Sequence, residues 1–402
     1  MINKIQAKIL MTLNYNVIAV FLASLLFVFC GNKIEYGKGY SQNYSISSEQ
    51  LKLFQDYQQQ ILCQRVVDQQ GPVGQPEELW RFHAGGNVYS TPAISDKLIF
   101  FASTNGIFYC LNRESGSVVW KFRSNRPFFR NTAIRFSPFF YGEAVIFGDF
   151  SGKLYSLNQM TGNVNWIFEA SETFEKGGIL IGENIIVGSH NSRLYSINAA
   201  SGNKNWDFPA GGLIELIPAY KNDRIFFGAG DHIFYGLTSK TGSLDWRFQT
   251  ENRLESSPIV FDDFVGFGGQ DSIFYVVNAA DGTLHWNYKT GGDIDSSPVY
   301  YRGKLYFGNK EGLLYCLDAA QGELLRSFTL GDEVDSGPII ADGILYVGSN
   351  IGDSDGILYA LNTETQEVMW QYEVPGGIEC TPVVYDGTLY FGTTGGDFFA
   401  VR

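Results

Sequence analysis

An internal repeat of about 40 residues constrains the fold of this chain more than any other feature of its sequence. A tryptophan marks one position of the unit, and in most copies the proline of a Ser-Pro-like element follows 12 residues later. Arg326 stands in one tryptophan slot; the other slots hold Trp80, Trp120, Trp166, Trp206, Trp246, Trp286 and Trp370. Eight copies in one register predict units that bury a common core by packing against their neighbours.

Each copy contains four short apolar runs separated by tight-turn sequences, as in "SSPVYY", "KLYFG", "LLYCLD" and "ELLRSF" of the sixth copy. Such runs, rich in β-branched and aromatic residues, are typical of antiparallel strands. Four strands in about 40 residues match one blade of a propeller. The sequence therefore predicts an all-β fold over residues 79–402: an eight-bladed β-propeller of four-stranded antiparallel blades.

The two ends of the repeat region predict how the ring closes. The chain stops at "GGDFFAVR", after the third strand of a unit, and the repeats begin at "ELWRF", a fourth strand with no partner before it. An unpaired edge invites aggregation. We therefore expect the N-terminal strand near Trp80 to complete the eighth blade. The tryptophans, which lie on the fourth strands, are expected to fill the wedges between blades near the outside.

Residues 1–30 are typical of an export signal, because lysines precede the 13-residue apolar core "VIAVFLASLLFVF". The stretch "LLFVFCGN" resembles the lipobox of bacterial lipoproteins, which implies that Cys30 is lipidated as the first mature residue. Phe29 departs from the small residue usual before that cysteine, so a plain cleaved signal or an uncleaved anchor remain alternatives. Residues 31–78 have the composition of a flexible tether, with a possible short helix from Ser48 to Val67.

Charge and motif content exclude several classes of function. A formal net charge of −13 argues against nucleic-acid binding, which requires clustered Lys and Arg. The four histidines occupy unlike repeat positions and none has a Cys or His at ligand spacing, so we predict no metal site. No nucleophile elbow, P-loop or dinucleotide fingerprint is present, and we predict no catalytic residues.

Acidic residues recur three positions before the proline slot of six copies. Tyr89 and Arg135 hold this slot in the first two copies, and the others hold Glu175, Glu215, Glu255, Asp295, Asp335 and Glu379. Because the Ser-Pro strand is innermost in a propeller, these side chains are expected to form a ring around the central channel. Such a ring would favour a bound cation or a basic peptide. The alternative is structural: each carboxylate accepts hydrogen bonds from backbone or serine groups, and Arg135 is an internal counter-charge.

The insertion "SNRPFFRNTAIR" interrupts the repeat between the first two copies. It combines arginines with aromatic residues in an otherwise acidic chain, which is typical of interaction hot spots. The residues of this predicted partner-binding loop are Arg126, Phe128, Phe129, Arg130 and Arg135. The alternative is a loop that packs over the channel mouth.

The stretches "LYFGNKEGLLYCLDAAQGELL" and "FYVVNAADGTLHW" resemble the pyrroloquinoline-quinone (PQQ) repeat. One branch of that family, the quinoprotein alcohol dehydrogenases, carries adjacent cysteines, a Ca²⁺ site and a catalytic Asp; this chain has no adjacent cysteines. In its size, lipoprotein-like start and closing strand the chain is similar to the other branch, the BamB-type outer-membrane assembly lipoproteins.

That second resemblance implies a monomeric, non-enzymatic scaffold without a cofactor. It would be lipid-anchored to the bacterial outer membrane, face the periplasm and bind other envelope proteins. The alternatives are a PQQ- and Ca²⁺-dependent oxidoreductase and a surface-exposed binding module.

Overall fold

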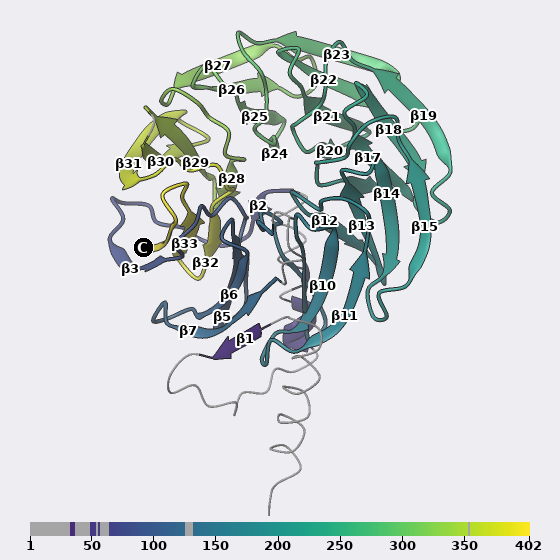
Figure 1. The fold of residues 1–402 in the computed structure, drawn as a ribbon. Coiled ribbons are helices and arrows are strands. Elements are labelled where there is room, and N and C mark those ends of the chain that lie inside the picture. Colours follow the sequence, from purple (N-terminus) through teal and green to yellow (C-terminus); the bar gives the residue numbers. More distant parts are fainter. Residues whose placement is uncertain (1–32, 37–48, 54, 57–63, 125–131, 353) are drawn as a thin grey trace, which may run out of the picture.

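The computed structural model describes residues 33–36, 49–53, 55–56, 64–124, 132–352 and 354–402. In these residues eight sheets surround one central axis, with the shortest strand of each sheet innermost (Figure 1). The prediction of an all-β, eight-bladed propeller is confirmed. Among the described residues, no helix has the length and apolar character needed to cross a membrane.

The first four blades follow one another along the chain. Blade one contains β4 (Ala93–Ile94), β5 (Leu98–Ser103), β6 (Ile107–Asn112) and β7 (Val118–Arg123). Blade two contains β8 (Phe139–Tyr141), β9 (Ala144–Gly148), β10 (Lys153–Asn158) and β11 (Val164–Glu169). Blade three contains β12 (Gly178–Ile181), β13 (Asn184–Ser189), β14 (Arg193–Asn198) and β15 (Lys204–Pro209). Blade four contains β16 (Ala219–Lys221), β17 (Arg224–Gly228), β18 (Ile233–Thr238) and β19 (Leu244–Gln249).

The remaining blades continue the series and end with a sheet that both ends of the repeat region share. Blade five contains β20 (Ile259–Phe261), β21 (Phe264–Gly268), β22 (Ile273–Asn278) and β23 (Leu284–Lys289). Blade six contains β24 (Val299–Tyr301), β25 (Lys304–Gly308), β26 (Leu313–Asp318) and β27 (Leu324–Thr329). Blade seven contains β28 (Ile339–Ala341), β29 (Ile344–Ile351), β30 (Asp355–Asn362) and β31 (Glu367–Pro375). Blade eight contains β32 (Val383–Tyr385), β33 (Thr388–Gly392), β34 (Asp397–Val401) and β3 (Glu78–His83).

The predicted closure is confirmed by the register of β3. This strand pairs antiparallel with β34, so that Trp80 lies opposite Ala400 and Phe82 lies opposite Phe398. Backbone hydrogen bonds continue beyond the strand, because the Glu77 and Arg402 amides each donate to the other residue's carbonyl, at 2.8 and 2.9 Å. The edge of β34 is thereby fully paired.

The segment expected to be a flexible tether contributes two strands to the ring. β1 (Lys33–Tyr36) pairs antiparallel with β7, and β2 (Val66–Val67) pairs parallel with β28, so blades one and seven each have five strands. Residues 49–53 and 55–56 are helical. The possible helix therefore does not extend to Val67, which pairs with Ala341 instead.

Six of the eight joints between blades place an outer-strand tryptophan against a glycine of the next blade. A Cβ atom at Gly162 would lie 2.9 Å from the Trp120 indole, and this glycine has a positive φ of 68°. Trp120 Nε1 also donates to the Gln159 carbonyl, at 3.0 Å. The same tryptophan–glycine contact recurs at Gly116, Gly202, Gly242, Gly282 and Gly322. The glycines of the repeat are thus required both by backbone conformation and by the close indole.

Two joints depart from this pattern. Between blades six and seven both partners are missing, since Arg326 is exposed and Gln366 holds the glycine slot with a φ of 57°. Between blades seven and eight the glycine turn is replaced, because the fourth strand of blade eight is β3 from the N-terminal side of the repeats. The Pro72 carbonyl, which precedes β3, accepts hydrogen bonds there from Trp370 Nε1 at 3.2 Å and Tyr346 OH at 3.0 Å. The segment before β3 therefore completes this joint.

Nearer the axis, stacked aromatic pairs join neighbouring blades. The ring centroids of Phe108 and Phe147 lie 3.9 Å apart, and those of Phe101 and Phe398 lie 4.3 Å apart across the closure. All four side chains are buried, and the two members of each pair belong to different blades. Burial of one such side chain is worth about 1.5–3 kcal/mol. These contacts therefore stabilise the packing of one blade against the next.

Candidate functional site

The eight residues of the predicted ring converge on one cavity at the axis. They lie in the loops that lead from the outer strand of one blade to the inner strand of the next. The cavity has a volume of about 360 Å³ and is lined by Tyr89, Arg135 and all six acids, Glu175, Glu215, Glu255, Asp295, Asp335 and Glu379. The structure therefore brings together every acidic residue that the repeat register singled out.

The residues one position before the proline slot join neighbouring blades by hydrogen bonds in the wall of the cavity. The Ile217 amide donates to Ser257 Oγ at 3.1 Å, and the Ser257 amide donates to Ser297 Oγ at 3.2 Å. The buried Arg65, which directly precedes β2, also lines the cavity and donates from Nη1 to the Pro298 carbonyl at 3.0 Å. A residue from outside the repeats is thus part of the site.

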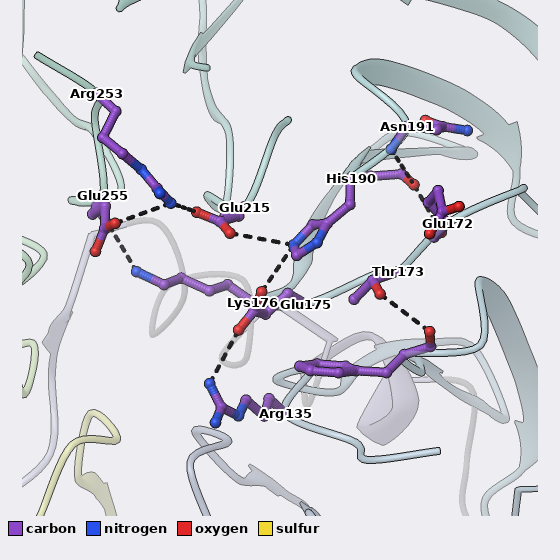
Figure 2. Close-up of polar contacts among 12 residues, drawn as sticks. Arg135, Glu172, Thr173, Glu175, Lys176, His190, Asn191, Glu215, Arg253 and Glu255 are labelled. Atoms are coloured by element: carbon purple, nitrogen blue, oxygen red, sulfur yellow. Dashed lines mark hydrogen bonds and ion pairs between the residues drawn. The ribbon is translucent and has the colours of Figure 1, made fainter. Parts of the chain in front are cut away.

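On the side of blades two to five, basic side chains alternate with the acids (Figure 2). Arg135 Nη1 lies 3.2 Å from Glu175 Oε1. Arg253 Nη2 bridges two acids, at 2.5 Å from Glu215 Oε2 and 3.0 Å from Glu255 Oε1. Each of these carboxylates therefore has a side-chain cation as its partner.

His190 lies between the first two of these acids (Figure 2). Its Nε2 atom is 2.8 Å from Glu175 Oε2 and 3.4 Å from Glu215 Oε1. Burial alone would lower the pKa of His190, but the carboxylates of Glu175 and then Glu215 raise it. Burial would likewise raise the pKa of Glu175, whereas contact with His190 and the charge of Arg135 lower it.

Sequence reasoning missed His190 as a member of the site. The signal that reveals it is positional: His190, Gln270 and Lys310 each stand 12 residues after the proline slot of their copies. All three side chains contact an acid of the ring, and Gln270 Nε2 donates to Glu255 Oε1 at 2.7 Å. This second repeat position supplies partners to the acidic position.

On the side of blades six to eight the acids are less well compensated. Lys310 Nζ lies 2.5 Å from Asp335 Oδ2 and 3.4 Å from Asp295 Oδ2. Within the described chain, the buried Oδ1 atoms of both aspartates have no hydrogen-bond partner. Burial, with the charges of Asp295 and Glu333, outweighs Lys310 and raises the pKa of Asp335 to about 7. Burial also raises the pKa of Glu379.

The charge balance differs from both interpretations of the ring. Six acidic and five basic side chains line the cavity; the basic ones are Arg65, Arg135, Lys176, Arg253 and Lys310. The expectation of a concentrated negative potential did not include Arg65, Lys176, Arg253 and Lys310. These four residues lie outside the repeat position that the acids and Arg135 share. The partners of most acids are side-chain cations rather than the expected backbone and serine groups.

Asp335 gives the channel a testable pH dependence. An unperturbed aspartate has a pKa of about 3.9. Because the folded value is higher, the free energy of unfolding falls as pH rises from about 4 to 7. Each pKa unit is worth about 1.4 kcal/mol. Asp335→Asn should therefore gain about 2 kcal/mol or more over the wild type between pH 5 and pH 8, in urea unfolding at both pH values.

The groups that face Asp335 are Lys310, Asp295 and Glu333, and all three remain in this variant. The matched control is Asp386→Asn, because the Asp386 side chain is 68% exposed. The control should show the same difference between the two pH values as the wild type. An equal pH response in Asp335→Asn and the wild type would contradict the prediction.

The remaining predicted site residues have different outcomes. Arg135 lies in the channel mouth, with its guanidinium 4.3 Å from the centre of the Tyr89 ring. Arg126, Phe128, Phe129 and Arg130 of the predicted loop, and Cys30, lie outside the described residues. The tryptophans form the joints between blades described above.

Comparisons with known proteins give the family and the fold. A family model described as "Outer membrane protein assembly factor BamB" matches residues 74–179, 178–297 and 269–402. No curated protein sequence matches the chain. Among solved structures, BamB from Moraxella catarrhalis has a TM-score of 0.68 and 16% identity, and the match covers 82% of this chain and 100% of that one.

Enzymes share the same architecture. A europium-containing methanol dehydrogenase has a TM-score of 0.73 and 12% identity, over 89% of this chain and 100% of that one. A quinohemoprotein alcohol dehydrogenase from Pseudomonas putida HK5 has a TM-score of 0.71 and 12% identity, over 89% and 82%. At these identities the likeness shows the fold alone.

The residues of the cavity do not fit a quinone cofactor. A planar quinone requires a free aromatic or apolar face, but Tyr89 is the single aromatic residue among the described lining residues and Arg135 covers its ring. Cys380, which also lines the cavity, has no neighbouring cysteine in the sequence. Its thiol accepts a hydrogen bond from the Gly392 amide at 3.3 Å, and burial raises its pKa to about 12.

Proposed function

Because the chain belongs to the outer membrane protein assembly factor BamB family, we propose that it is a non-enzymatic scaffold of the bacterial envelope. It binds protein partners during the assembly of outer-membrane proteins. The observation that carries this proposal is the family match, which extends over residues 74–402 and includes every blade. The poor fit of the channel to a quinone supports the scaffold over an oxidoreductase.

The position in the cell follows from the same premise. Cleavage before Cys30 and lipidation of that residue would attach a monomeric propeller to the outer membrane, facing the periplasm. The "LLFVFCGN" stretch supports this placement. Labelling with a radioactive or clickable palmitate should mark the wild type and leave Cys30→Ser unmarked.

The outer wall of blades six and seven supplies a surface for partner binding. Leu324 and Leu325 of β27 are 46% and 47% exposed, and Val368 and Met369 of β31, the outer strand of the next blade, are 45% and 37% exposed. They lie beside the joint that lacks the tryptophan–glycine contact. Exposed apolar side chains grouped in this way mark interaction surfaces.

The test is a crosslinked pull-down of the full chain from envelope fractions. We expect components of the outer-membrane assembly machinery to co-purify, and the Leu324→Asp/Leu325→Asp variant to recover at least about fivefold less of them, since burying an unpaired charge costs several kcal/mol. Leu244→Asp is the control, because Leu244 is 46% exposed at the same repeat position of blade four. Recovery of no envelope protein, or dye-linked turnover with quinone and Ca²⁺, would refute the scaffold role.

A further inference from the structure

We infer that Glu175, His190 and Glu215 form a divalent metal site, and that Zn²⁺ is the ion whose chemistry they fit best. One imidazole nitrogen and two carboxylate oxygens lie within 4.8 Å of one another. The distances from Nε2 to the two oxygens, 2.8 and 3.4 Å, are close to those between neighbouring ligands of a tetrahedral Zn²⁺, about 3.3 Å for bonds of about 2.0 Å. The inference is independent of the proposed scaffold role.

The imidazole nitrogen of His190 faces two carboxylates at once. Its buried Nε2 atom lies 2.8 Å from Glu175 Oε2 and 3.4 Å from Glu215 Oε1. A single N–H bond points at one of these oxygens only, whereas an ion placed between the three donor atoms bonds to all of them. This convergence of three donor atoms favours a metal ion at the site.

The two carboxylates are oriented by arginines that use their other oxygen atoms. Arg135 contacts Oε1 of Glu175, whereas His190 faces Oε2. Arg253 contacts Oε2 of Glu215, whereas His190 faces Oε1. Each glutamate therefore keeps one oxygen for the metal while the arginine fixes the carboxylate plane. Such outer partners are a regular part of metal sites, because they hold the ligands in place.

The backbone around His190 is also fixed. His190 lies in the turn between β13 and β14, and its amide donates to the Thr173 carbonyl at 3.0 Å. The preceding Ser189 donates from Oγ to the Glu172 carbonyl at 2.9 Å, and the Ile214 amide donates to the Ser189 carbonyl at 3.2 Å. These bonds tie the turn to the two loops that carry Glu175 and Glu215. The ligands come from blades three and four, so a bound ion would crosslink adjacent blades.

Charge permits a dication at this position. Zn²⁺ binds the neutral form of imidazole, and the two carboxylates supply two negative charges beside the ion. The cavity beside it is lined by six carboxylates and five basic groups. A set of one imidazole and two carboxylates suits Zn²⁺ among N- and O-binding ions. Three protein ligands would leave the fourth position of a tetrahedral ion to water or to a donor from a bound protein.

The test is a titration of the chelator-treated mature chain with Zn²⁺ and with Co²⁺ as a spectroscopic substitute. We expect one ion per chain by calorimetry and visible absorption bands of four-coordinate Co²⁺. His190→Ala should weaken Zn²⁺ binding by about 100-fold or more, since ligand loss exceeds the 10–100-fold effect of outer partners. Glu215→Gln, which keeps the side-chain shape, should also weaken it.

His232→Ala is the matched control, because His232 lies in the corresponding turn of blade four but outside the three-ligand group. It should bind Zn²⁺ as the wild type does. Thermal unfolding without metal establishes that each variant is folded. Absence of stoichiometric binding to the wild type, or equal binding by wild type, His190→Ala and Glu215→Gln, would overturn the inference and leave the pull-down result of the scaffold role unaffected.

Discussion

A chain that lacks residues 1–84 is expected to lose the closed ring and to aggregate, because β34 would be left with an unpaired edge. The deletion removes the β3 ladder and the contacts of Trp80 and Phe82 with blades eight and one. Both side chains are half-buried, so together they contribute less than the about 3–6 kcal/mol that full burial of two such groups would give. Together with the lost β3 ladder, this is a substantial part of the usual net stability of about 5–15 kcal/mol. Thermal unfolding and size-exclusion chromatography measure the effect.

The control is a chain that lacks only residues 1–63. It keeps β2, Pro72 and β3, and it should unfold within a few degrees of the full chain. A synthetic peptide of residues 70–88 contains β3. When it is added to the chain that lacks residues 1–84, it should pair with β34 and restore solubility. A chain without residues 1–84 that melts cooperatively, as a monomer and at the temperature of the full chain, would show that β3 does not close the ring.

Trp120→Ala is expected to destabilise the protein by about 3–5 kcal/mol, the usual loss for removing a large buried aromatic residue. The indole is 0% exposed and packs over Gly162, and its Nε1 donates to the Gln159 carbonyl. The substitution removes apolar contacts between blades one and two and leaves a buried carbonyl without its donor. Urea unfolding at fixed pH gives the change in free energy.

Arg326→Ala is the matched control for this substitution. Arg326 occupies the same repeat position in blade six, but it is exposed, and Gln366 holds the glycine slot of the next blade. Surface substitutions of this kind usually change stability by less than about 0.5 kcal/mol. Equal losses in the two variants would mean that the tryptophan joints do not stabilise the ring.

The ring, its eight blades and its closing strand were all predictable from the sequence, because the repeat encodes them locally. The period gives the blade, and the missing fourth strand after "GGDFFAVR" gives the partner of "ELWRF". These two segments alone were enough to predict the pairing between β3 and β34 that the structure contains. A repeat protein exposes its architecture in this way because each unit contacts only its neighbours.

Features that depend on contacts outside the repeat could not be predicted. The pairing of β2 with β28 and the role of the Pro72 carbonyl leave no periodic signal, since each occurs once. The contacts of His190 could not be predicted, because its partners Glu175 and Glu215 are 15 and 25 residues away in the sequence. They meet His190 only in the folded ring, where blades three and four are neighbours. The cations of the channel were missed for the same reason: Lys310 and Arg253 occupy different repeat positions.

The attachment of the segment before β3 determines how the ring would respond to a mechanical load at its N-terminal side. Force on that segment reaches β1 first, then β2 beside blade seven, and only afterwards β3. The backbone pairing of two short strands must rupture before tension reaches the strand that closes the circle. Stretching of the leading segment would therefore be absorbed in successive small steps while the closed propeller remains intact.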